Sequence, residues 1–149
     1  MQIAFYDNRK TTKGMLNLIL QPNDIIFTYR GMVYRAGVVL NTYGKDMLAN
    51  QVFVVIRLNN DAPISPIALL RYLRSKFCQD YFSNCTIGVA FKTIPVKKIE
   101  ELPVPALSPN AIKREEDLFA QQQNILDRIN QLKNDLLKLE ITDIPENWD

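Results

Sequence analysis

Histidine is absent from the 149 residues of this chain. Because histidine is the commonest general base and the commonest metal ligand, its absence excludes Ser-His-Asp and Cys-His catalysis within the chain. The only two cysteines, Cys78 and Cys85, cannot build a disulfide framework or, without histidine, a four-ligand zinc site. We expect both to be buried thiols, and the sequence predicts no metal site.

Glycine is also scarce, and the five glycines are scattered. They form neither a phosphate-cradling GxxxxGK[ST] loop nor a GxGxxG cofactor loop. The acidic residues show no spacing that would bring two carboxylates and a lysine together on a metal. The sequence therefore predicts no catalytic residues and no cofactor, and a small carboxylate-dependent enzyme is the weakest alternative.

Long apolar runs are missing as well, since none approaches the ~18–20 residues that a membrane-spanning helix needs. The N-terminus lacks the basic start and apolar core of a signal peptide. The length suits one domain of ordinary size. These features predict a soluble, cytoplasmic protein without a membrane partner.

Charge is distributed unevenly along the chain. Residues 1–100 carry 13 Lys and Arg against 6 Asp and Glu, whereas residues 101–149 carry 5 against 10. A basic body followed by an acidic end is typical of a polyanion-binding domain with a solvated helix, although chance could produce the same imbalance.

The pattern of residues predicts an α+β fold with a mixed sheet. Residues 23–41 indicate two strands joined by a sharp turn at Arg30-Gly31, and residues 51–58 indicate a central strand covered on both faces. Ser65-Pro66 and Ser108-Pro109 each combine a helix cap with a first-turn proline. They predict helices over 66–82 and 108–140, and the proline-rich stretch between them is expected to be extended.

The chain thus divides into a domain at 1–107, a long helix at 108–140 and a tail at 141–149. The long helix carries an apolar seam with alternating spacings of four and three residues, which is typical of coiled-coil a and d positions. Nearly thirty residues at ~1.5 Å each span roughly 43 Å, more than a small domain can cover, so a partner helix is expected. The seam consists of Leu118, Gln122, Ile125, Ile129, Leu132, Leu136 and Leu139.

Tyrosine and arginine crowd the turn of the first hairpin, and these side chains either pack the sheet or contact a ligand. The planar fork of arginine suits guanine edges and phosphates, asparagine and glutamine suit adenine, and lysine suits phosphates. The candidate DNA contacts are Tyr29, Arg30, Tyr34, Arg35, Lys45, Asn50, Gln51 and Lys92.

The order of these parts resembles one target-recognition half of a type I restriction–modification specificity subunit. The resemblance rests on "NDIIFTYRG", "NQVFVVIRLN", "SPIALLRYLRSKF", "IPVKKIEELPVP" and the glutamine-containing long helix, over about residues 21–140. It implies a non-enzymatic target-recognition-type domain that reads part of a split sequence in double-stranded DNA. It also implies a spacer helix that docks adenine-N6 methyltransferase subunits, with restriction subunits completing the complex.

The sequence departs from that family in having one recognition domain, one helix and a short lead-in. It is therefore expected to be a half-subunit or a truncated form, and a half-subunit predicts a homodimer with antiparallel helices. The alternative is a coiled-coil interaction or scaffold protein that recruits a partner without specific DNA readout.

Overall fold

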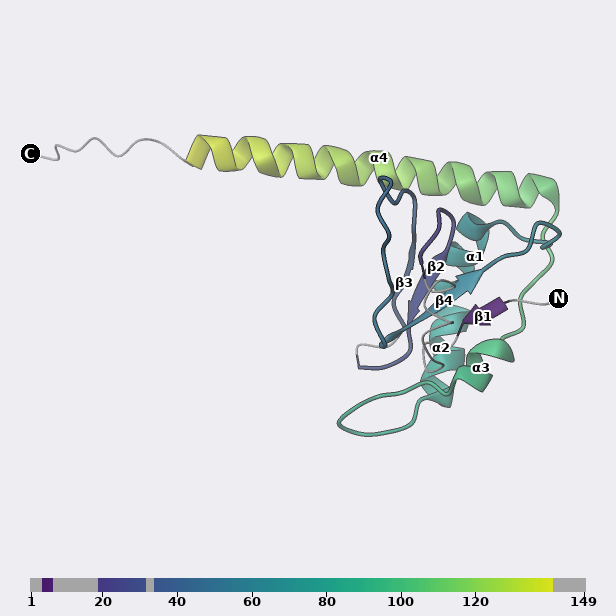
Figure 1. Ribbon diagram of the computed structural model, residues 1–149. Helices are drawn as coiled ribbons and strands as arrows, with labels where there is room; N and C mark the ends of the chain where they lie inside the picture. Colours follow the sequence, from purple (N-terminus) through teal and green to yellow (C-terminus); the bar gives the residue numbers. More distant parts are fainter. Residues whose placement is uncertain (1–3, 7–18, 32–33, 141–149) are drawn as a thin grey trace, which may run out of the picture.

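The computed structural model describes residues 4–6, 19–31 and 34–140. It consists of a small α+β head and a long C-terminal helix, α4 (Pro109–Glu140), that crosses the head and projects well beyond it (Figure 1). The predicted tail at 141–149 lies outside the described residues.

Four strands form the sheet: β1 (Ala4–Tyr6), β2 (Ile25–Thr28), β3 (Ala36–Val38) and β4 (Phe53–Arg57). Their order is β1-β4-β2-β3, and every neighbouring pair is antiparallel. The expected mixed sheet is therefore wrong for the described strands. The physical reason is the short connection from β2 to β3, because parallel neighbours need a crossover of about a dozen residues or more.

Strand β4 lies inside the sheet and is covered on both faces, which confirms the prediction for residues 51–58. Val54 and Ile56 belong to the main core between the sheet and the helices. Val55 points to the opposite face, where it packs with Leu20 and Val39 in a second, smaller cluster. This two-sided burial explains why the strand is an almost unbroken apolar run.

The helix predicted over residues 66–82 is instead two helices, α1 (Pro66–Leu73) and α2 (Lys76–Cys85). Ser65 caps α1, as expected, and Ser75 caps α2 by accepting a hydrogen bond from the Cys78 amide at 3.4 Å. Because the chain bends at Ser75, the apolar stripe of α1 does not continue through Phe77, which is exposed.

A short helix, α3 (Val96–Glu100), interrupts the stretch that was expected to be extended. Its N-cap is Pro95, where proline's missing N–H costs no helical hydrogen bond. The helix contributes Ile99 to the main core. The prolines at 103 and 105 follow the helix and leave only the remainder of the stretch extended.

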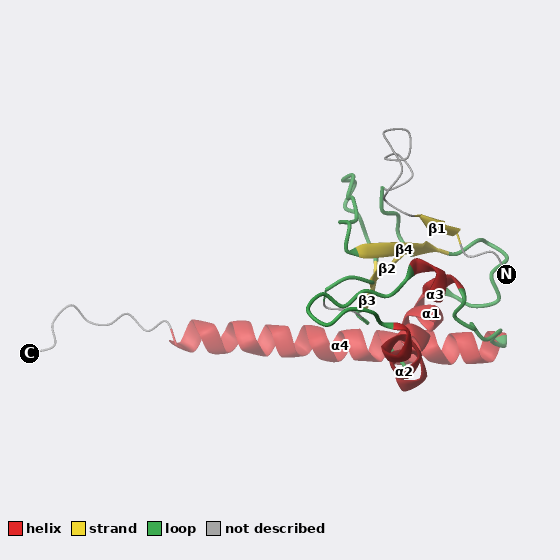
Figure 2. Cartoon of the chain, turned by 90° about the horizontal axis from the view of Figure 1, so that it is seen from below, coloured by secondary structure: helices red, strands yellow, loops and turns green. Residues whose placement is uncertain are grey.

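All four helices lie on one side of the sheet (Figure 2). The long helix begins at the predicted Ser108-Pro109 cap, where Ser108 Oγ accepts from the Ala111 amide at 3.3 Å. Its first half joins the head through the buried Phe119 and through an ion pair between Arg71 and Glu115. None of the helices in the described part of the chain combines the length and apolar character that a membrane crossing requires.

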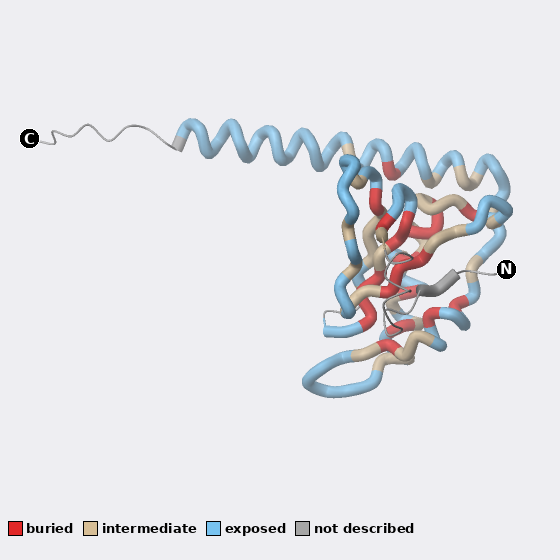
Figure 3. Tube along the Cα trace, in the orientation of Figure 1, coloured by how far each residue is buried: buried red, intermediate tan, exposed pale blue. Residues whose placement is uncertain are grey.

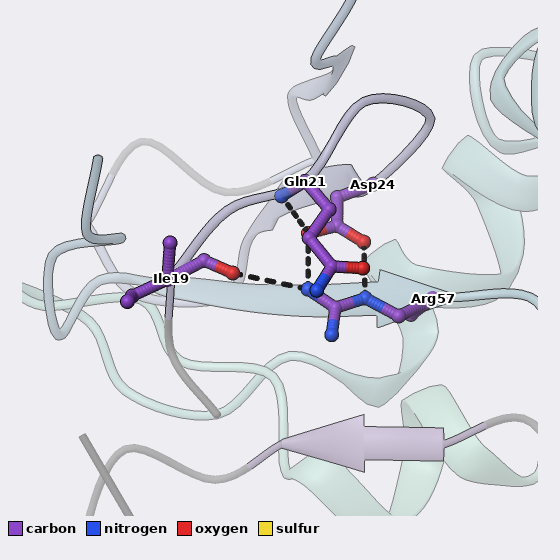
Figure 4. Close-up of polar contacts among 4 residues, drawn as sticks. All are labelled: Ile19, Gln21, Asp24 and Arg57. Carbon is purple, nitrogen blue, oxygen red and sulfur yellow. Dashed lines mark hydrogen bonds and ion pairs between the residues drawn. The ribbon is translucent and has the colours of Figure 1, made fainter. Parts of the chain in front are cut away.

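A buried ion pair joins the start of β2 to the end of β4 (Figure 4). The Asp24 carboxylate is 1% exposed and accepts two hydrogen bonds from the Arg57 guanidinium, both at 2.7 Å. Asp24 also accepts from the Gln21 amide, and Arg57 also donates to the Ile19 carbonyl. The pair ties the chain before β2 to the sheet.

Candidate nucleic-acid interface

The connection between β2 and β3 is a loop rather than the sharp Arg30-Gly31 turn expected from the sequence. The two strands do form an antiparallel hairpin, and the Thr28 amide still donates to the Arg35 carbonyl at 2.8 Å. Beyond Thr28 the chain leaves the hairpin, and Arg30 pairs with Thr93 in an isolated antiparallel bridge. The loop thereby brings residues 30 and 92–94 together.

The two tyrosines of this loop pack against the core of the head. Tyr29 is a buried core residue, and its amide and carbonyl bond the backbone of Val52 and Ile94. Tyr34 is half-buried with a positive φ of 70°, and its hydroxyl forms a hydrogen bond with the Thr86 hydroxyl. Both rings therefore act in packing, and a ligand would meet the neighbouring arginines instead.

Arg30 is exposed and lies over the ring of Tyr29, with its guanidinium carbon 5.1 Å from the ring centroid. This cation–π contact holds the guanidinium in place without using its hydrogen-bond donors. The Gly31 amide donates to the Lys92 carbonyl at 2.9 Å, so the backbone of Lys92 lies next to that of Arg30 and Gly31. Lys92 is also exposed. The sequence placed these two residues 62 positions apart, and the fold joins them.

Arg35 lies at the same end of the sheet, and its side chain is exposed. Thr28 fixes its backbone, because the Thr28 hydroxyl accepts from the Arg35 amide at 3.0 Å and donates to its carbonyl at 2.9 Å. Asn50 and Gln51 are exposed and directly precede β4, whose first residue pairs with Thr28. These residues surround the open end of the β2–β4 pair.

Lys45 is exposed in the loop between β3 and β4, where its amide donates to the Thr42 carbonyl at 3.0 Å. Lys45 takes no part in the backbone hydrogen bonds that hold the segments of Arg30, Arg35 and Lys92 together. The eight candidate residues thus divide into two packed tyrosines, five exposed residues around one end of the sheet, and Lys45 on a separate loop.

The loop between α2 and α3 adds a feature that the candidate residues did not include. Its tip carries Val89 and Phe91, which are 99% and 83% exposed. The sequence indicated only that this stretch is a loop tip or a short strand. The signal that could have identified it is the run Ile87–Phe91, which is apolar but lies between turn residues rather than within a predicted strand.

The segments that carry the cations at this end of the sheet are free of acidic residues. Residues 25–45 and 86–99 contain no aspartate or glutamate, although they carry Arg30, Arg35 and Lys92. Three carboxylates directly flank these segments: Asp24, which is buried against Arg57, and the exposed Asp46 and Glu100. An anionic ligand therefore meets cations here without competing carboxylates from these segments.

The distal part of the predicted seam of α4 is exposed, whereas Gln122 near its start lines a cavity beside α1. The seam residues are exposed, whereas Phe119, one position away from the seam, is the buried contact. Figure 3 shows the distal half of α4 exposed throughout. The exposed apolar seam residues are Leu118, Ile125, Ile129, Leu132, Leu136 and Leu139.

A cavity of about 530 Å³ lies where α1, α4 and the preceding linker meet. Arg71 and Glu115 line it and pair at 2.5 Å. Tyr72 also lines it, and burial, with Cys78 beside the hydroxyl, raises the pKa of Tyr72 to about 12. The protonated hydroxyl donates to the Pro103 carbonyl, so this site contains structural contacts rather than an acid–base pair.

The prediction that both cysteines are buried is confirmed for Cys78 alone, because Cys85 is only half-buried. Cys78 is fully buried, and burial raises the pKa of its thiol, which keeps it protonated and unreactive. Across the described residues, no group of three or more cysteine, aspartate and glutamate side chains is arranged to hold a metal ion.

A scan against protein-family models and a search of curated proteins found no match for this chain.

Proposed function

We propose that this chain is a specificity half-subunit of a type I restriction–modification system, whose head is a target-recognition-type domain that reads one part of a target in double-stranded DNA. The observation that carries the proposal is the gathering of Arg30, Arg35 and Lys92 around one end of the sheet. The segments that hold them contain no acidic residue.

The chemistry of these residues suits a duplex. Arginine binds the O6 and N7 edge of guanine with two parallel hydrogen bonds, and lysine binds phosphate as a point charge. Arg30 is oriented by the Tyr29 ring, which lowers the entropy lost when its guanidinium binds a base. Lys92 beside it would contact the backbone and set the register of the head on the groove.

The long helix supports the second half of the proposal. Its distal seam exposes apolar side chains that a partner helix would cover, and an antiparallel second copy would place two heads at opposite ends of the pair. The helix pair would dock adenine-N6 methyltransferase subunits, joined by restriction subunits, in the cytoplasm. In this proposal those subunits supply the chemistry and bind the cofactors.

Selection from a random duplex library, with and without a methyltransferase partner, tests the proposal. We expect one short sequence to be enriched, with affinity that falls as salt rises because bound phosphates release counterions. Enrichment of no sequence under either condition contradicts the proposal.

Two variants separate base reading from phosphate binding. Arg30→Ala should flatten the preference at about one base pair, at a cost of roughly 1–3 kcal/mol for the preferred sequence. Lys92→Ala should weaken all duplexes similarly and lower the slope of log affinity against log salt by about one. Lys76→Ala is the control, because Lys76 is an exposed lysine on α2 that pairs with Asp80.

The second candidate function is a scaffold that recruits a partner through α4 without reading DNA. The exposed distal seam favours it, because partner binding needs only that surface. Capture of a methyltransferase by a chain that shows no duplex preference would select this candidate.

A further inference from the structure

The loop between α2 and α3 exposes apolar surface at its tip. Ile87, Val89 and Phe91 are 60%, 99% and 83% exposed, and they alternate along five residues. Single exposed apolar residues are ordinary, but three together on one protruding loop indicate a contact surface. We call residues 87–92 the apolar loop.

The apolar loop has a defined conformation. Ile87 and Thr93 exchange two backbone hydrogen bonds of 2.9 Å, which close the loop at its base. Gly88 has a φ of 92°, and a Cβ at this position would lie 2.4 Å from the Phe91 carbonyl oxygen. The shape therefore requires glycine at position 88, and it presents Val89 and Phe91 on a fixed support.

The base of the apolar loop is cationic. Thr93 pairs with Arg30, and the carbonyl of Lys92 accepts from Gly31. In Figures 1 and 2 the loop protrudes toward the same side as the distal half of α4. A ligand that covers both the tip and the base of the loop would meet apolar side chains at the tip and positive charge at the base.

A DNA duplex complements this arrangement, because stacked bases lie between two rows of phosphates. Proteins that insert apolar side chains between base pairs unstack one step and kink the duplex, while neighbouring cations hold the phosphates. An acidic-rimmed protein surface has a similar charge pattern, and DNA is favoured because Arg30 and Lys92, beside the loop, are the residues that the proposed function assigns to the duplex.

We propose that the apolar loop is a wedge that inserts Phe91, supported by Val89, at one base step of the bound duplex and kinks it there. The inference rests on the proposed DNA-binding function and adds a second means of reading sequence. Pyrimidine–purine steps unstack most readily, so the head prefers TA or CA/TG at the wedge position without hydrogen bonds to those bases.

The test uses the full chain and the duplex enriched by the selection described above. One set of duplexes carries 2-aminopurine at successive steps to report unstacking, and another carries dyes at both ends to report bending by energy transfer. We expect the wild-type chain to bend the duplex and to raise 2-aminopurine fluorescence at one step only.

Replacing both Val89 and Phe91 with serine should abolish the bend and the local fluorescence rise, and weaken binding by about tenfold or more. Gly88→Ala should reduce the bend while keeping both apolar side chains, because it distorts the loop. Phe77→Ser is the matched control, since Phe77 is an exposed phenylalanine on α2. Urea denaturation verifies that each variant is folded.

The outcomes are distinguishable. If the wild-type chain binds its selected duplex without bending or unstacking it, the wedge is overturned and the proposed function stands. If the serine variant bends DNA normally but no longer binds a methyltransferase, the loop is a protein-docking element and the wedge is again overturned. If the wild-type chain prefers no duplex at all, the proposed function fails together with the wedge.

Discussion

At the scale of single residues, charge serves two separate purposes in the head. Asp24 and Arg57 are bonded to each other at the edge of the core, whereas Arg30, Arg35 and Lys92 face outward. The two groups differ in burial and partners rather than in residue type. Only the outward group is available to an anionic ligand.

The buried pair leads to a stability prediction. Asp24→Ala removes two hydrogen bonds to the Arg57 guanidinium, whose side chain is 25% exposed, and hydrogen bonds to a charged group contribute about 1.5–3 kcal/mol. We expect that loss in the free energy of unfolding measured by urea denaturation. Asp80→Ala removes the exposed pair with Lys76 and should cost about 0.5 kcal/mol or less. Similar losses for both variants would contradict the structural role of Asp24.

The types of the candidate residues could be chosen from the sequence, but their grouping could not. Tyrosine and arginine beside Gly31 identify the loop, yet no local pattern shows that residues 92–94 pair with residue 30. That pairing depends on how the helices return the chain to the sheet. The same limit explains why Tyr29 could be a contact or a core residue until its burial was known.

At the scale of elements, local signals account for two of the four helix starts in the described residues. Both serine–proline caps were predicted, and both mark the observed starts of α1 and α4. The break at Ser75 was missed because Phe77 and Tyr81 extend the apolar spacing of α1. Burial of Cys78 and Phe82 decides the outcome, since α2 turns these residues toward the core instead.

The cap of α2 can be tested directly. Ser75→Ala removes the acceptor for the Cys78 amide and should lower the free energy of unfolding by about 1 kcal/mol. Ser75→Asp should retain most of the stability, because aspartate is an equally good cap. Ser83→Ala, at an exposed position within α2, is the control and should be nearly neutral. A loss for Ser83→Ala equal to that for Ser75→Ala would rule out capping as the cause.

At the scale of the whole molecule, the head is stabilised by its own core, whereas the distal half of α4 has its apolar residues exposed. Phe119 belongs to that core, whereas the apolar seam residues beyond residue 122 are exposed. The heptad spacing predicted this long helix, and the structure adds the point at which it leaves the head. Periodicity alone could not place that point, because Leu118 and Phe119 fit an apolar stripe equally well.

Self-association follows from the exposed seam. We expect sedimentation to show a dimer, and replacement of both Leu132 and Leu136 with glutamate to give a monomer whose head unfolds at an unchanged urea concentration. The reason is that both leucines are more than half exposed in the single chain. Replacement of Gln131 and Asn134 with glutamate adds the same charge at other exposed positions and should leave the dimer intact. A wild-type chain that sediments as a monomer would contradict this expectation.

The length of α4 also has a metric consequence. With 32 residues at ~1.5 Å each, the helix measures about 48 Å, and on the proposed antiparallel pairing it sets the interval between two heads. Adding one heptad to the distal half preserves the seam and lengthens the pair by about 10.5 Å. Since base pairs stack about 3.4 Å apart, the gap between the two half-sites would widen by about three base pairs. The number of heptads in α4 would then determine the spacing between the two half-sites.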